Sequence, residues 1–174
     1  MSQRDSGYKR VAFDQYETPE WVTQALIPHI PKYDILEPAA GNGKMAKVII
    51  ANGFVVEQSD IQTGVNFLTD IHKDYEAIVT NPPYAAAFDF IDTALNLTYQ
   101  KFGFVAMLLR TDFDHAKSRR GIFADHYAFA KKIVLTKRIQ WFEDSKSSPS
   151  FNHAWFIWDW NNTHSPTLCY HFED

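Results

Sequence analysis

The sequence predicts an α/β fold in which one domain, residues 1–174, holds a mostly parallel seven-stranded sheet with helices on both faces. Apolar segments typical of strands alternate along the chain with segments of helical period, as in parallel α/β sheets. The 174 residues are 45% hydrophobic and 16% aromatic, which suits one packed core and leaves little room for a second domain. Residues 155–160 carry large apolar side chains at both odd and even positions, which indicates a strand buried on both faces.

Local signals place the helices and strands in order. Thr18 and Pro19 are typical of a helix N-cap and a first helical residue, and this helix should end before Pro31. A second helix is expected from Lys44 to Ala51, closed by Gly53, and a third over residues 85–100. The expected strands are residues 33–36, 54–57, 76–80, 102–109, 132–135, 154–160 and 167–172. Ligands of such a sheet bind at the carboxyl ends of its strands.

Composition excludes several classes of protein. The single cysteine, Cys169, allows no internal disulfide and no cysteine cluster for zinc or iron. The seven histidines lack the helical spacing of a histidine metal site, so we expect no metal. Apolar runs fall short of the roughly 20 residues that a membrane-spanning helix needs, so we expect no membrane role. The polar start of the chain lacks the apolar core of a secretory signal, and we expect a cytoplasmic protein.

Charge is unevenly distributed along the chain. The net charge is −4, yet residues 101–146 hold ten Lys or Arg against five Asp or Glu. Two interpretations stay open at this point: a solvated face, or a basic patch that binds a phosphate backbone. In the second interpretation the candidates for phosphate contacts are Arg110, Lys117, Arg119 and Arg120.

A glycine-containing loop follows the first expected strand. Residues 37–43 read Glu-Pro-Ala-Ala-Gly-Asn-Gly, and the two glycines allow a tight turn with close approach of a ligand. The third glycine of a dinucleotide-binding fingerprint is missing, and there is no phosphate-binding GK[ST] loop. Taken alone, the segment is equally compatible with a plain turn between a strand and a helix.

A more specific motif, Asn81-Pro82-Pro83-Tyr84, ends the third expected strand. The Asn81 side-chain oxygen and the Pro82 carbonyl oxygen are suited to accept both hydrogens of an exocyclic amine and so to orient its lone pair for attack. The Tyr84 ring is suited to stack on the base that carries the amine. The alternative is that two prolines simply end the strand in a turn.

Taken together and in this order, five segments resemble the S-adenosylmethionine (SAM)-dependent amino-methyltransferases, and most closely the small, phage-type adenine-N6 DNA methyltransferases. The segments are residues 16–19, 37–43, 60–61, 66–68 and 81–84, with weaker similarity over 142–159. The resemblance implies a Rossmann-like methyltransferase domain, SAM as cofactor and DNA as partner.

The resemblance also implies a role for each matching residue. Tyr16, Thr18 and Pro19 would border the methionine part of SAM, and Glu37, Pro38, Ala39 and Gly41 would line its amino-acid and sulfonium end. Asp60 would bind the ribose hydroxyls, with Glu57 as a less favoured candidate, and Ile61 and Phe67 would enclose the adenine ring. Asn66 stands where the family usually has aspartate, so the lost charge predicts weaker binding of SAM.

For the target base, the resemblance implies direct methyl transfer at Asn81, Pro82 and Tyr84 without a covalent enzyme intermediate. Methylation at carbon 5 of cytosine is excluded, because Cys169 does not follow a proline. A base in duplex DNA would have to be flipped into the pocket, and the candidates to face Tyr84 across it are Phe142, Phe151 and His153. Packing in the core or in a loop explains each of these three better than contact with a base does.

Two alternative functions stay open. The Asn-Pro-Pro-Tyr motif also occurs in methyltransferases that act on exocyclic amines of RNA or on the glutamine amide of proteins, because the geometry of the amine is shared. A non-catalytic SAM-binding subunit of a larger complex is a further alternative, although such a subunit does not need the motif. No segment is large enough for a separate target-recognition domain, so we expect short or absent sequence specificity.

Overall fold

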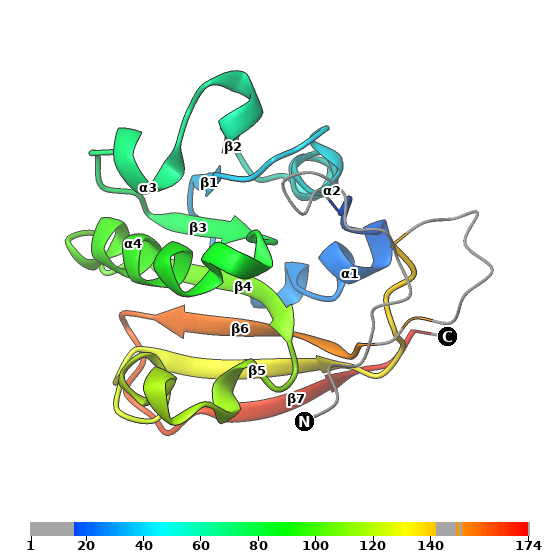
Figure 1. Cartoon of the computed structure of the whole chain (residues 1–174), viewed down its shortest axis with the longest axis vertical. Helices are drawn as coiled ribbons and strands as arrows, with labels where there is room; N and C mark the ends of the chain where they lie inside the picture. The colour runs from blue at the N-terminus through cyan, green and yellow to red at the C-terminus, as the bar shows by residue number, and fades with distance from the viewer. Residues whose placement is uncertain (1–15, 142–148, 150, 174) are drawn as a thin grey trace.

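The computed structural model describes residues 16–141, 149 and 151–173. Within these residues one seven-stranded sheet has the strand order β2-β1-β3-β4-β6-β5-β7 (Figure 1). The strands are β1 (Ile35–Glu37), β2 (Val56–Gln58), β3 (Ala77–Thr80), β4 (Phe104–Arg110), β5 (Phe129–Leu135), β6 (His153–Asp159) and β7 (Thr167–His171).

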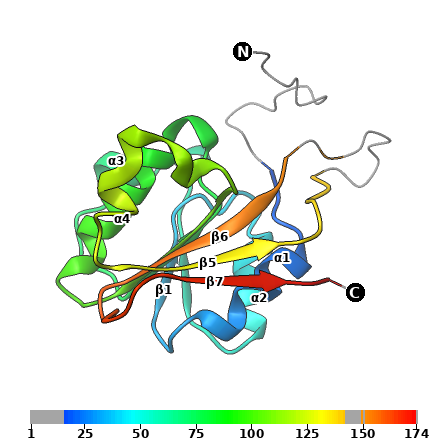
Figure 2. The ribbon, with the colours of Figure 1, turned by 90° about the horizontal axis from the view of Figure 1, so that it is seen from below.

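Strand β6 is the one that runs against the others. It is antiparallel to both of its neighbours, β4 and β5, whereas the remaining strand pairs are parallel. Figure 2 shows β5, β6 and β7 side by side, and in Figure 1 the arrowhead of β6 points in the direction opposite to that of β5. The amino end of β6 therefore lies at the same edge of the sheet as the carboxyl ends of the other strands. His153, the first residue of β6, pairs there with Arg110, the last residue of β4.

Helices cover both faces of the sheet. The α-helices are α1 (Glu20–Gln24), α2 (Lys44–Ala51), α3 (Phe67–Asp70) and α4 (Ala87–Tyr99), and the short 3-10 helices are η2 (Ile27–His29), η3 (Ile61–Thr63), η4 (Tyr84–Ala86), η5 (Phe113–His115) and η6 (Lys117–Ile122). One core cluster packs the sheet against α3, α4 and η6, and the other packs it against α1, η2 and α2.

Alternation along the central strands divides the core into these two clusters. In β4, Val105 and Met107 point to the side of α4, whereas Ala106 and Leu108 point to the side of α1 and α2. In β6, Trp155 is fully buried on the second side, and its indole Nε1 donates to the Val22 carbonyl oxygen at 2.8 Å. The central strands are thus buried on both faces, as their continuous apolar sequence predicts.

The sequence-based expectations for the elements are confirmed with shifts at their ends. Helix α2 has the expected bounds, and Gly53 follows it with a φ of 88°. Strand β5 begins three residues earlier than expected, at Phe129, with a register shift between Phe129 and Lys131.

The expected N-cap at Thr18 is wrong. Helix α1 begins at Glu20, and the Pro19 carbonyl accepts from the backbone N–H of Val22 at 3.1 Å. The Thr18 hydroxyl instead lies beside β3, where it accepts a hydrogen bond from Asn81 Nδ2 at 3.3 Å. None of the helices in the described part of the chain is long and apolar enough to cross a membrane.

Candidate functional site

A cavity of about 1090 Å³ opens at the carboxyl ends of β1, β2 and β3, where the topology places a ligand. Its volume is at the upper end of the range for small-molecule sites. All eleven residues expected to bind the cofactor line it: Tyr16, Thr18, Pro19, Glu37, Pro38, Ala39, Gly41, Asp60, Ile61, Asn66 and Phe67. Of the expected catalytic residues, Asn81 lines the cavity, whereas Pro82 is buried and Tyr84 lies outside the lining.

The loop after β1 is shaped by its two glycines. Gly41 and Gly43 have φ values of 53° and 76°, in the left-handed region that favours glycine. A Cβ at Gly43 would lie 2.6 Å from Gln58 Oε1, so a side chain there would force Gln58 to move. The Gly41 backbone N–H donates to Asp60 Oδ2 at 2.8 Å, which joins this loop to the end of β2.

Asp60 is held in place by two backbone donors. Its Oδ1 accepts from the Gln62 N–H at 2.8 Å, and its Oδ2 accepts from Gly41. Each carboxylate oxygen keeps a second lone pair, so the group can still accept hydroxyl hydrogens. The other ribose candidate, Glu57, does not line the cavity, because its carboxylate binds Lys73 Nζ at 2.7 Å and the Tyr75 hydroxyl at 3.0 Å.

Glu37 presents a buried carboxyl group at the cavity wall. The residue is 2% exposed, and its Oε2 has no hydrogen-bond partner among the described residues. Burial raises the pKa of Glu37 to about 8, and the nearby Asp60 adds to the rise, whereas the Ala46 backbone N–H opposes it. A buried acceptor of this kind is costly unless a cation or a donor satisfies it, and an ammonium group would do both.

The opposite end of the cavity is suited to a flat apolar ring. Ile61 is 53% exposed although it is large and apolar, whereas Phe67 is 2% exposed and packs on Phe90 at a ring distance of 4.9 Å. Asn66 caps α3, and its Oδ1 accepts from the Leu68 N–H at 3.1 Å. A ring placed between Ile61 and Phe67 would cover the exposed side chain of Ile61.

The Asn81 side chain has a defined orientation. Its Nδ2 donates to the Tyr16 carbonyl oxygen and to Thr18 Oγ1, both at 3.3 Å. A carbonyl oxygen is an acceptor only, so the amide atom that faces Tyr16 must be the nitrogen. Both hydrogens of Nδ2 are thereby used inside the protein, and Oδ1 is left as an acceptor at the cavity wall.

Four aromatic rings form a closed cycle beside Asn81. Tyr84 contacts Tyr16 and His153, and both of these contact Trp141, with distances between ring centroids from 5.2 to 6.3 Å. The Tyr84 hydroxyl lies 2.8 Å from His153 Nε2, so a base cannot stand between these two rings while the bond is intact. His153 therefore does not face Tyr84 across a base in this conformation.

Trp141 and Gln140 line the cavity and were missed by sequence reasoning. The signal was present, since both residues follow β5 at the ligand-binding edge of the sheet. Sequence reasoning chose the neighbouring Phe142 instead, which lies outside the described residues.

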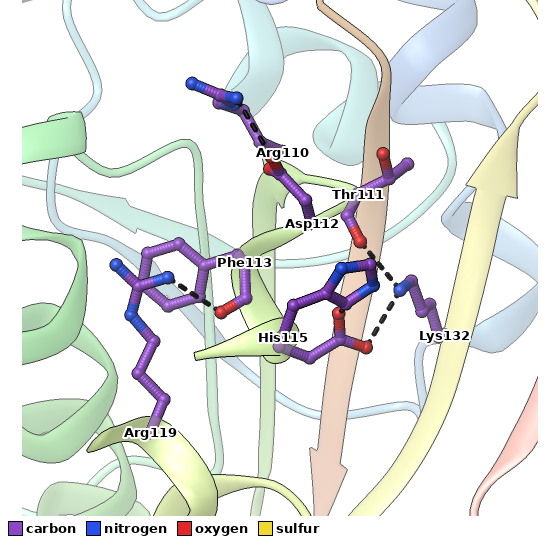
Figure 3. Close-up of polar contacts among 8 residues, drawn as sticks. Arg110, Thr111, Asp112, Phe113, His115, Arg119 and Lys132 are labelled. Carbon is purple, nitrogen blue, oxygen red and sulfur yellow. Dashed lines mark hydrogen bonds and ion pairs between the residues drawn. The ribbon is translucent and has the colours of Figure 1, made fainter. Parts of the chain in front are cut away.

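The basic candidates for phosphate contacts are partly occupied within the protein. Arg110 binds Asp112 at 2.9 Å and lies 4.0 Å from the ring centroid of Phe151. Arg119 donates to the Phe113 carbonyl at 2.8 Å (Figure 3). Arg120 binds Asp125 at 2.7 Å. Lys117 is exposed on η6, and its side chain makes no hydrogen bond or ion pair with the other described residues. The face of the Phe151 ring is thus in contact with the Arg110 guanidinium group, so that this face is not free to stack on a base.

A polar network behind these residues fixes the loop after β4. Lys132 Nζ lies 2.8 Å from Asp114 Oδ2 and 2.8 Å from the Thr111 carbonyl oxygen (Figure 3). Both side chains are largely buried, with exposures of 17% and 21%. The described residues hold no group of three or more His, Cys, Asp or Glu that could bind a metal ion.

Comparison with known proteins places the fold. No family model matches the chain, and no curated protein matches it. A putative class I SAM-dependent methyltransferase from Listeria monocytogenes superposes at TM-score 0.57 with 11% identity, over 88% of this chain and 62% of that one. A methyltransferase subunit of a type I restriction-modification system from Streptococcus thermophilus gives TM-score 0.57 and 14% identity, over 87% of this chain and 47% of that one.

A third structure has a length close to that of this chain. The putative RNA methyltransferase from Pyrococcus horikoshii superposes at TM-score 0.53 with 15% identity, over 90% of this chain and 91% of that one. The chain has the fold of SAM-dependent methyltransferases. In this methyltransferase fold the cavity after β1, β2 and β3 is the site at which a ligand is expected.

Proposed function

We propose that this chain is a SAM-dependent methyltransferase that transfers a methyl group to the exocyclic N6 amine of adenine in DNA. One observation carries the proposal: the Asn81 amide is turned so that Oδ1 serves as an acceptor at the wall of a large cavity in a methyltransferase fold. An acceptor in this position suits a substrate with N–H hydrogens to donate, as an exocyclic amine has.

The residues around the cavity fit SAM as the cofactor. The unpartnered Oε2 of Glu37 is suited to the ammonium group of the methionine part, which would satisfy a buried acceptor and offset its desolvation. Asp60, fixed by Gly41 and Gln62, is suited to the ribose hydroxyls. Ile61 and Phe67 are suited to the two faces of the adenine ring. When bound, SAM supplies an electrophilic methyl group on a sulfonium.

The residues of the Asn81-Pro82-Pro83-Tyr84 segment then orient the amine. Asn81 Oδ1 and the Pro82 carbonyl oxygen accept its two hydrogens, which directs the nitrogen lone pair away from the base plane. Tyr84 holds the base by stacking. The protein supplies no nucleophile and forms no covalent intermediate, because its task is alignment in a site from which water is excluded.

DNA is the favoured carrier of the amine for two reasons. The sequence resembles adenine-N6 DNA methyltransferases over residues 16–84, and one of the similar structures is a restriction-modification methyltransferase subunit. Lys117 is exposed on η6 and Arg110 is half-exposed at the end of β4, and both are the proposed phosphate contacts. In this proposal residues 1–174 form one domain that performs the reaction.

The test is to incubate the protein with methyl-labelled SAM and equal masses of unmethylated DNA, RNA and protein extract, and to digest each labelled product. We expect label in N6-methyladenine from DNA. Label only in RNA or in glutamine would contradict the DNA assignment while keeping the amine chemistry. Bound SAM without label in any product would instead support a non-catalytic SAM-binding subunit.

An Asn81→Ala variant tests the mechanism in the same assay. We expect transfer to fall by at least about 100-fold, with SAM affinity changed much less, because Asn81 acts on the amine. The control is Asn96→Ala, which removes an exposed asparagine of α4 away from the cavity. Transfer unchanged in Asn81→Ala would overturn the assigned role of Asn81.

A further inference from the structure

His153 is a polar residue at the start of an otherwise apolar buried strand. It is 2% exposed, and the five residues after it in β6, Ala154 to Trp158, are all apolar and buried. A buried polar side chain needs a specific partner to offset its lost hydration. The partner here is the hydroxyl of Tyr84, 2.8 Å from His153 Nε2, across 69 residues of sequence.

The imidazole of His153 is neutral at physiological pH. Burial lowers its pKa to about 4, and the positive charge of Arg110 lowers it further, whereas Asp112 and the backbone at Phe151 oppose the shift. The ring is also packed edge-on against Trp141 at a centroid distance of 5.2 Å. His153 is therefore an uncharged hydrogen-bonding group with little freedom to rotate.

Tyr84 is the residue of the motif whose ring needs such a partner. It begins η4, directly after Pro83, and it is not among the residues that line the cavity. A tyrosine ring that stacks on a base must be held in one plane before the base arrives, because ordering it afterwards weakens binding. The Tyr16 ring contacts the Tyr84 ring at a tilt of 44°.

We propose that His153 is a positioning residue that holds the Tyr84 ring for the target base through the bond between Nε2 and the Tyr84 hydroxyl. The inference rests on the proposed function, in which Tyr84 stacks on the base that carries the amine. It assigns His153 to a place beside Tyr84, so the opposite face of the base is bounded by another group.

A double-mutant cycle tests this role. The variants are Tyr84→Phe, which keeps the ring and loses the hydroxyl, His153→Leu, which loses the hydrogen-bonding nitrogen, and the combination of both. We expect each single variant to lower the kcat/KM for the nucleic-acid substrate by about 3- to 10-fold, the scale of one hydrogen bond. The double variant should lose no more than either single variant, because both remove the same bond.

The conservative variant His153→Gln separates positioning from simple packing. Its amide can hydrogen-bond the Tyr84 hydroxyl, so we expect it to retain more kcat/KM than His153→Leu, while the KM for SAM stays within about 2-fold in both. Circular dichroism and thermal unfolding are measured for every variant. Two results would overturn the proposal. One is a fall in kcat/KM in the double variant that equals the product of the falls in the two single variants. The other is an equal fall in kcat/KM in His153→Gln and His153→Leu.

A spectroscopic measurement is independent of methyl transfer. In protein labelled with ¹⁵N-histidine, the ring nitrogens of His153 should keep the shifts of a neutral imidazole down to about pH 5, and the Nε2 signal should move in Tyr84→Phe. An unchanged Nε2 signal would show that the bond is absent and would overturn the inference. If the Nε2 signal behaves as expected but the protein transfers no methyl group to any substrate, the proposed function is overturned, whereas the hydrogen bond between His153 and Tyr84 is confirmed.

Discussion

Thr18 Oγ1 accepts a hydrogen bond from Asn81 Nδ2 at 3.3 Å, which joins the residue before α1's N-cap to the tip of β3. Both residues line the cavity, and Thr18 is 4% exposed. The bond contributes to the orientation of an amide whose other face is assigned to the substrate. In the proposed mechanism Thr18 would therefore act on the amine through Asn81, in addition to lining the cavity.

The substitution Thr18→Val tests that relationship. Valine keeps the shape of threonine and removes one of the two acceptors of Asn81 Nδ2, so the Tyr16 carbonyl oxygen remains as the other. We expect kcat to fall by about 5-fold, the scale of one neutral hydrogen bond, while the Kd for SAM changes by less than about 2-fold. Steady-state kinetics and calorimetric titration measure the two quantities. Thr18→Ser retains the hydroxyl and should restore most of kcat; a kcat equal to that of Thr18→Val would argue for packing instead.

The raised pKa of Glu37 leads us to expect that binding of SAM releases a proton. At pH 7 a carboxyl with a pKa of about 8 is mostly protonated, whereas an ammonium partner favours the charged form. Calorimetric titration in buffers of different ionisation enthalpy should show release of about one proton per SAM at pH 7. Glu37→Gln should abolish the release and weaken SAM binding by about 10- to 100-fold. The matched control, Glu57→Gln, changes a carboxylate outside the cavity and should retain the release.

The same group predicts how the stability of the free protein depends on pH. The folded-state pKa of Glu37 lies above its ordinary value of 4.5, so the folded protein retains a proton that the unfolded chain loses between pH 4.5 and 8. Its contribution to stability is therefore present below pH 4.5 and is lost as the pH rises to about 8. Thermal unfolding should show Tm of Glu37→Gln rising relative to the parent protein from pH 5 to pH 8. A constant difference would contradict the raised pKa.

Asn66→Asp is expected to strengthen cofactor binding. The aspartate keeps the acceptor that caps α3 through the Leu68 N–H and adds a negative charge beside the expected adenine amine. We expect the Kd for SAM to fall by about 5-fold, the gain from a charged acceptor, with little change in Tm because asparagine and aspartate cap helices equally well. Asn52→Asp, at the end of α2, is the control for added charge. If Asn66→Asp and the parent protein bind SAM with equal affinity, Asn66 does not contact the adenine ring of SAM.

Lys132→Met should destabilise the protein through Asp114. The substitution keeps the length of the side chain and leaves the largely buried Asp114 carboxylate without its lysine partner. We expect a loss of about 1 to 3 kcal/mol in the free energy of unfolding, measured by urea denaturation at pH 7. The control, Lys73→Met, breaks an ion pair whose side chains are 62% and 50% exposed and should cost much less. Equal losses of unfolding free energy in Lys132→Met and Lys73→Met would show that burial does not make the Lys132–Asp114 ion pair more important for stability.

Sequence reasoning located most of the fold because its signals were local. The bounds of α2 follow from its apolar pattern and from Gly53, which adopts a positive φ. The position of β6 follows from its continuous large apolar side chains. Even the loop after β1 could be expected from Gly41 and Gly43 in the sequence.

The parts that could not be predicted depend on contacts between distant residues. Threonine is a residue type typical of an N-cap, but the Thr18 hydroxyl accepts a hydrogen bond from Asn81, 63 residues away. Helix α1 begins two residues later, at Glu20. The bond between Tyr84 and His153 depends on the reversed direction of β6, which no local pattern reveals. Trp141 reaches the cavity for a similar reason, since its place depends on where β5 lies in the sheet.

The reversed direction of β6 also determines where this protein can change during evolution. The connection between β5 and β6 leaves the sheet at Leu135 and returns at His153, and both residues lie at the ligand-binding edge. An insertion between them would enter the chain beside the cavity without altering the strand order or either core cluster. Under the proposed function, a longer connection is therefore the place where contacts to a target could be added while the strands and helices that surround the cavity stay the same.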